Sequence, residues 1–66
     1  MSVLKVIELL ASSTVSWEDA SQKAISKASK SLKNIKSIYI KNQSAAVVEG
    51  KISEYRVTLK VTFELE

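Results

Sequence analysis

The strongest constraint on the fold is a regular alternation at the end of the chain. Between Glu54 and Leu65, apolar or aromatic side chains occupy every second position, and polar or charged side chains fill the positions between them. A period of two is that of a β-strand with one face buried and the other exposed. The sequence therefore predicts a final strand whose core face consists of Tyr55, Val57, Leu59, Val61, Phe63 and Leu65.

A helical period marks Ser16–Leu32, the one long helix that the sequence predicts. Ser16 is followed three residues later by Asp19, which resembles a capping box with Asp in place of the usual Glu or Gln. At 100° per residue the following side chains share one stripe, which we expect to face the sheet: Trp17, Ser21, Ala24, Ile25, Ala28 and Leu32.

Lysines follow the opposite side of this helix, at positions 23, 27 and 30. Lys23 stands four residues after Asp19, a spacing that predicts an ion pair. The lysines could form an anion-binding or nucleic-acid surface, but solvent-facing charge is the usual state of such a face, and we favour that interpretation. Trp17 could similarly stack on a ligand, yet its place on the apolar stripe favours a packing role.

Two further strands complete the pattern. Val3–Leu10 is apolar on both faces, which predicts cover by the helix on one side and by a neighbouring subunit on the other, and residues 12–14 read as a loop. Ile35–Val48 is rich in β-branched residues, with a polar middle at 42–44 that suggests a bulge or bend. Glu49–Gly50 is a hairpin-turn signal. The predicted fold is α+β, in β-α-β-β order with a three-stranded antiparallel sheet.

Strict alternation along this second long strand would divide its side chains between two faces. Ile38, Ile40 and Asn42 would share one face, and Tyr39 and Gln43 the other.

Composition limits the function classes. The chain has 66 residues, a net charge of +3, and neither Cys nor His, so disulfides and the commonest transition-metal ligands are excluded. Residues 1–66 read as one domain, and a core this small usually needs a further stabiliser, for which a symmetric homo-oligomer is the remaining candidate. Without Cys or His an enzyme is disfavoured. No membrane partner, metal site or secretory signal is indicated, and a cytoplasmic location is expected.

Several short segments point together to a known family. They occur in order along almost the whole chain: KVIEL at 5–9, SWEDA at 16–20, ASKSL at 28–32, EGK at 49–51 and VTF at 61–63. With the β-α-β-β order, the sequence resembles the dodecins, small flavin-binding proteins that assemble as hollow dodecamers. The resemblance implies a homododecamer in which a sheet curls around one helix. It also implies a non-catalytic role in storing or sequestering riboflavin or FMN.

The resemblance also implies a site near two-fold axes between subunits. In flavin-binding members an aromatic residue of the second strand stacks on the ring and a glutamine of the third strand bonds its polar edge; the matching positions here are Ser37 and Arg56. Asn42 and Gln43 match polar groups near the ribityl chain. The predicted ligand-binding residues are therefore Ser37, Asn42, Gln43 and Arg56, with Tyr39 as a substitute aromatic surface.

Two alternatives remain open. Serine has no π-face and arginine only donates hydrogen bonds, so the chain could be a structural or ion-binding assembly of the same fold that has lost flavin binding. Ser44 and Glu64, which match basic residues that hold the flavin phosphate in some members, point the same way. A nucleic-acid surface on the lysine stripe is the weaker alternative; we expect no nucleic-acid partner.

Overall fold

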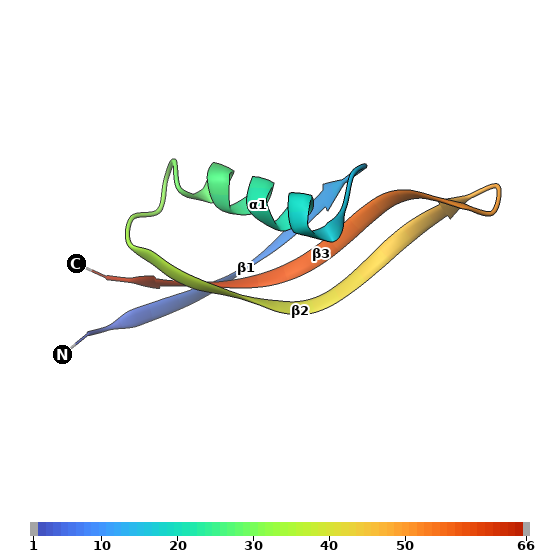
Figure 1. Ribbon diagram of the computed structural model, residues 1–66. Coiled ribbons are helices and arrows are strands. Elements are labelled where there is room, and N and C mark those ends of the chain that lie inside the picture. Colours follow the sequence, from blue (N-terminus) through green and yellow to red (C-terminus); the bar gives the residue numbers. More distant parts are fainter. Residues whose placement is uncertain (1, 66) are drawn as a thin grey trace.

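The computed structural model describes residues 2–65, which form one helix and three strands in β-α-β-β order (Figure 1). Their bounds are β1 Leu4–Ser13, α1 Trp17–Ala28, β2 Ile35–Val48 and β3 Lys51–Glu64. The sheet is antiparallel with strand order β1-β3-β2, and α1 lies across one of its faces. The predicted α+β fold and its element order are confirmed.

The core lies between β3 and α1. Val57, Leu59 and Val61, on the predicted core face of β3, are almost completely buried. Ala20 of α1, which has no exposed surface, packs with Val57 and Leu59. A methyl group at this position lets the helix approach the sheet closely. The predicted helix stripe left Ala20 out. Leu65 was assigned to the core face, but β3 ends one residue earlier and Leu65 is 46% exposed.

β1 presents two different faces. Ile7 and Leu9, which pair with Val61 and Leu59, are half-buried on the helix side of the sheet. On the other side three large apolar side chains stay exposed: Leu4, Val6 and Leu10. The predicted cover on the helix side is therefore present, and the helix-free face of β1 is open in the single chain.

β1 also runs further than predicted. Residues 12 and 13 were expected in a loop, but both pair with β3, opposite Arg56 and Tyr55. Ser13 is buried, and its hydroxyl both donates to Asp19 Oδ2 at 2.6 Å and accepts from the Val15 N–H at 2.9 Å. Ser13 thus joins the end of β1 to the first turn of α1.

The first turn of α1 is capped as the sequence indicates. The Asp19 N–H donates to Ser16 Oγ at 2.9 Å, which satisfies one of the free donors at the helix start. The reciprocal half of a capping box is missing, because the Asp19 carboxylate accepts from Ser13 and forms an ion pair with Lys23 at 3.0 Å. The predicted Asp19–Lys23 pair is confirmed.

The helix ends at Ala28, four residues before the predicted end at Leu32. Beyond it the chain tightens into turns, with the Lys30 N–H bonded to the Lys27 carbonyl at 3.2 Å and the Ser31 N–H to the Ala28 carbonyl at 3.0 Å. Serines at 29 and 31 favour such local turns over a continued helix. Asn34, with φ of 61°, then takes the left-handed conformation that asparagine tolerates and leads into β2.

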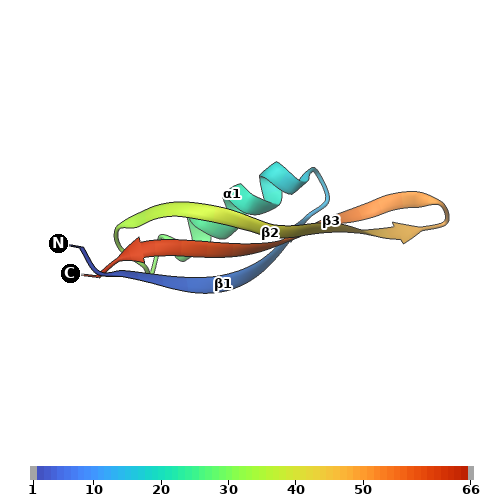
Figure 2. The ribbon, with the colours of Figure 1, turned by 90° about the horizontal axis from the view of Figure 1, so that it is seen from below.

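β2 and β3 form a long twisted hairpin that extends beyond both β1 and α1 (Figure 2). Its turn is the predicted Glu49–Gly50, with φ of 52° and 77°, between the paired residues Val48 and Lys51. Two positive φ values at the centre of a two-residue turn match the type I′ geometry that suits twisted strands. Past the pair Ser13–Tyr55 the hairpin has no third strand. We call residues 45–54 the hairpin arm.

The turn gives a direct test of the arm's backbone geometry. A Cβ added at Gly50 would meet no atom within 4 Å, so Gly50→Ala isolates the backbone cost of the left-handed conformation. We expect a loss of about 1–2 kcal/mol in the free energy of unfolding, measured by denaturant titration. Glu49→Asn is the matched variant and should raise stability, because asparagine favours the first turn position. An unchanged stability in Gly50→Ala would contradict the turn.

Asp19 makes stability depend on pH. The hydrogen bond from Ser13 and the neighbouring Lys23 hold the pKa of Asp19 below its ordinary value of 3.8. A carboxyl group whose pKa is lower in the folded protein than in the unfolded chain stabilises the fold at pH values above the unfolded pKa. This stabilisation is lost as the pH falls through the pKa of the folded protein. Asp19→Asn should therefore be less stable than the natural protein near about pH 6, with a difference that narrows below about pH 4. Thermal unfolding of both proteins across this range measures it, and Ser13→Ala should reduce the same acid sensitivity. A difference that is constant with pH would contradict this assignment.

Candidate functional site

Three of the four predicted ligand-binding residues share the helix-free face of the sheet. Ser37 pairs with Thr62, Asn42 with Thr58, and Arg56 belongs to the same alternate positions of β3. Residues directly opposite in neighbouring strands point to the same side. All three predicted residues are exposed, so this face is open to a ligand.

A bulge in β2 decides the side on which the polar middle of the strand lies. The register shifts between Ile40 and Asn42, which leaves Lys41 as the extra residue. Asn42 therefore leaves the side of Ile38 and Ile40, where strict alternation would place it, and joins the helix-free face. The predicted bulge is confirmed, and the strict alternation beyond it is wrong.

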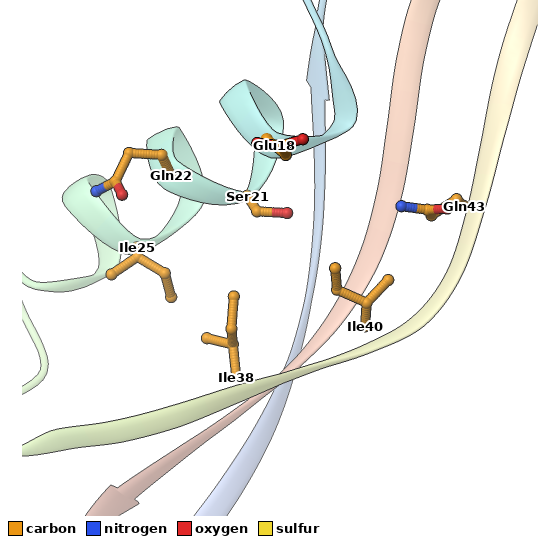
Figure 3. Close-up of a pocket in the computed structure, with 7 residues that line it drawn as sticks. All are labelled: Glu18, Ser21, Gln22, Ile25, Ile38, Ile40 and Gln43. Atoms are coloured by element: carbon orange, nitrogen blue, oxygen red, sulfur yellow. The ribbon is translucent and has the colours of Figure 1, made fainter.

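Gln43 is separated from the other three residues by the same bulge. It pairs with Val57, a core residue, and its side chain projects over the helix-facing side of the sheet (Figure 3). Within one chain the structure thus brings Ser37, Asn42 and Arg56 to one face and places Gln43 on the other.

Tyr39 lies between Ser37 and Asn42 along β2 and faces the same way. It pairs with Lys60 of β3, and 65% of its surface is exposed. Two residues of strand separate it from Ser37, a distance of about 7 Å. An accessible aromatic ring therefore lies next to Ser37 along the strand.

Arg56 is oriented by an acidic neighbour on its own strand. Its Nε donates to Glu54 Oε1 at 2.8 Å, and its side chain is largely exposed. Only one edge of the guanidinium is used by this bond, so its terminal amino groups remain able to donate to a ligand. Across the sheet Arg56 pairs with Ser44 and Ser12, whose small side chains leave it uncovered.

Two ion pairs flank this face. The bulge residue Lys41 reaches across β3 to Glu8 Oε1 at 3.2 Å, and Lys36 lies 3.7 Å from Glu64 Oε1. In each pair the carboxylate of the glutamate is already bound by a lysine. We call the residues Ser37, Tyr39, Asn42, Arg56 and Lys60 the polar strip.

A groove separates α1 from β2 on the other side of the sheet (Figure 3). The helix packs mainly on β1 and β3, which leaves the inner side of β2 partly uncovered. The groove has a volume of about 210 Å³ and is lined by three isoleucines and four polar residues: Glu18, Ser21, Gln22, Ile25, Ile38, Ile40 and Gln43. The sequence did not predict it, because it depends on where the helix rests.

A second groove follows the other side of the helix, against the free edge of β1. It has a volume of about 450 Å³ and includes Leu9, Ala24 and Ala28 beside the lysines at 23 and 27. Lys23 forms an ion pair with Asp19, and Lys23 and Lys27 are both solvent-exposed. This exposure agrees with the interpretation of the helix lysines as a solvated face.

Trp17 packs against other residues of its own chain. Its ring meets Tyr55 edge to face with a centroid distance of 4.9 Å, and its Nε1 donates to the Ser44 carbonyl at 2.8 Å. Trp17 therefore fixes the start of α1 to the base of the hairpin arm, and its predicted packing role is confirmed.

The described residues offer few other functional features. Residues 2–65 contain no group of three or more acidic side chains, His or Cys that could hold a metal ion. Over the same residues, no helix is long and apolar enough to cross a membrane. The polar strip and the two grooves are candidate binding features.

Comparison with known proteins identifies the family. Residues 3–66 match the family model described as Dodecin. The chain belongs to the dodecin family. It is 39% identical to the calcium dodecin of Mycobacterium tuberculosis over 66 residues, which cover 98% of this chain and 92% of that protein. It is 34% identical to the dodecin of Thermus thermophilus over 64 residues, covering 97% and 93% of the two chains.

Solved dodecin structures have the same fold. A variant of the Thermus thermophilus dodecin superimposes with a TM-score of 0.94 at 33% identity, covering 100% of this chain and 98% of that one. The Mycobacterium tuberculosis protein, described as a calcium-chelating antigen with a novel calcium-binding site, gives a TM-score of 0.84 at 38% identity, covering 98% and 93%. The recognition of this dodecin from its sequence is confirmed.

Proposed function

We propose that this dodecin is a non-catalytic flavin-binding protein that assembles as a homododecamer and holds riboflavin or FMN against the polar strip. The observation that carries the proposal is the exposed ring of Tyr39 among side chains able to form hydrogen bonds. Flavins present a flat aromatic ring with a polar edge, so a site for them needs a stacking surface beside donors and acceptors.

Each residue of the strip would have a distinct role. Tyr39 stacks on the isoalloxazine ring, and Ser37, being small, leaves room for that ring. Arg56 donates to the ring carbonyl oxygens, for which its terminal amino groups are free. The Asn42 amide can accept from the ring N–H as well as donate. Gln43 lies on the opposite face, so it would meet the ligand only from a neighbouring copy.

Assembly would also cover the apolar side chains that the single chain exposes. Leu4, Val6 and Leu10 line the helix-free face next to the strip, and few large side chains of the described chain are fully buried. A flavin held between two copies would be shielded on both sides of its ring. This enclosure fits storage or sequestration better than turnover, because it keeps solutes away from the ring.

Riboflavin titration tests the proposal. We expect the fluorescence of riboflavin to fall as protein is added, because a stacked aromatic ring quenches the excited flavin. Tyr39→Phe should keep this quenching, whereas Tyr39→Leu should weaken binding about fivefold, as expected for loss of about 1 kcal/mol of stacking. Arg56→Ala should weaken binding to a similar extent. Lys33→Ala, an exposed change outside the strip, is the control. Unchanged emission at saturating protein would refute flavin binding.

A second candidate function is ion binding, favoured by the 39% identity to a protein named calcium dodecin. Within the part of the chain that the structure describes, no cluster of acidic side chains forms a metal site. Glu8 and Glu64 are each paired with a lysine, so a calcium site would require carboxylates from more than one copy. Calorimetric titration with Ca²⁺, with Mg²⁺ as control, separates the two functions. Calcium-selective heat without flavin quenching would favour this candidate.

A further inference from the structure

The polar strip carries positive charge and no carboxylate of its own. Arg56 and Lys60 supply the charge, and both side chains are exposed on β3. Lys60 lies directly opposite Tyr39, and Arg56 follows four positions earlier on the same face, about 13 Å along the strand. A three-ring ligand stacked on Tyr39 spans a comparable length. Such a ligand would therefore lie against one cation and extend towards the other.

The carboxylates beside the strip do not cancel this charge. Glu54 accepts from Arg56 Nε at 2.8 Å. Glu8 is opposite Lys60 in the register, but its Oε1 atom lies 3.2 Å from Lys41 Nζ. Within residues 2–65, Lys60 itself forms no ion pair. These five side chains comprise three cations and two anions, so one positive charge remains in excess around the strip.

Arg56 selects a ligand by charge as well as by hydrogen bonds. A guanidinium group is permanently positive and only donates. An amide at the same place would be neutral and would both donate and accept. The terminal amino groups of Arg56 are not used by its bond to Glu54. Arg56 therefore favours a ligand edge that consists of acceptors and carries negative charge.

A flavin has such an edge in its reduced state. Reduction adds two electrons and one proton, which binds at N5, and N1 stays unprotonated in mildly alkaline solution. The reduced ring then carries one negative charge, shared between N1 and the neighbouring C2 carbonyl oxygen. The oxidised ring accepts hydrogen bonds at the same two atoms but has no net charge. A protein charge near N1 is one of the means by which a protein tunes a bound flavin.

Enclosure would strengthen the difference between the two states. Charges that face water attract each other weakly, because water and salt screen them. A ring held between two copies of the chain would be removed from most of this water. The Coulomb energy of a charge pair is several times larger in such surroundings than in bulk water. The excess positive charge would then act mainly on the ligand.

We propose that the polar strip binds the anion of reduced flavin more tightly than oxidised flavin, through the positive charges of Arg56 and Lys60. The inference rests on the proposed function and deepens it, because it names the redox state of the ligand that the site selects. Flavin would accordingly be retained under reducing conditions and released more readily once it is oxidised.

Anaerobic equilibrium dialysis of the natural protein measures the preference. Riboflavin is the probe, since it has no phosphate and its two redox states differ only in the ring. One series uses oxidised riboflavin and the other riboflavin reduced with dithionite, both in mildly alkaline buffer, and the free flavin is reoxidised in air before its absorbance is read. We expect a dissociation constant about tenfold lower for the reduced form, which raises the midpoint potential of bound flavin by about 30 mV.

Matched variants assign the preference to charge. Arg56→Lys keeps the positive charge and should keep most of the preference. Arg56→Gln keeps a hydrogen-bond donor but no charge, so it should still bind oxidised riboflavin while the ratio of the two dissociation constants falls towards one. Lys60→Gln should lower the same ratio in part. Lys33→Ala, an exposed change outside the strip, is the control and should leave the ratio unchanged.

The outcomes separate the inference from the proposed function. A natural protein that binds oxidised riboflavin as tightly as the reduced form, or more tightly, would overturn the inference and leave flavin binding in place. A protein that binds neither form would refute both. A ratio that is unchanged in Arg56→Gln and in Lys60→Gln would also overturn the inference. If Arg56→Gln fails to fold, as judged by circular dichroism, Lys60→Gln decides the result.

Discussion

Burial of one face of β3 beneath α1 is the interaction on which the rest of the structure depends. Val57, Leu59 and Val61 are the largest side chains that the fold buries completely, and all three lie on the central strand. Ala20 lets the helix approach that strand closely. Because a single helix covers part of one face, the other face, the inner side of β2 and the arm are left available. The polar strip, to which we assign the function, lies on the face that this small core does not cover.

The bulge at Lys41 gives the two sides of the sheet their different chemistry. It moves Asn42 to the helix-free face beside Tyr39 and directs Gln43 towards the helix. Lys41 itself forms an ion pair with Glu8 across the sheet. One extra residue thus separates a polar strip suited to a planar polar ligand from the groove between α1 and β2.

The parts of this structure that follow from local patterns could be predicted from the sequence. The alternation from Tyr55, the cap at Ser16 and the turn at Glu49–Gly50 each depend on neighbouring residues, and the structure contains all of them. The helix was predicted to end at Leu32 because the helical period continues to that residue. The periodic pattern does not show that Ser29 and Ser31 favour turns, and the helix ends at Ala28. The side of Asn42 and Gln43 could not be predicted, since the bulge position depends on pairing with β3.

The site itself was predictable only through the resemblance to dodecins. No residue type among Ser37, Asn42, Gln43 and Arg56 indicates flavin by its own chemistry, and the groove between α1 and β2 exists only after the helix has settled on β1 and β3. The central claim is that the polar strip of this dodecin holds a flavin. An absorption spectrum of the freshly purified protein tests this claim most directly. We expect the near-ultraviolet and blue bands of flavin in the same gel-filtration peak as the assembled protein. A colourless assembly that stays colourless after incubation with riboflavin would contradict the claim.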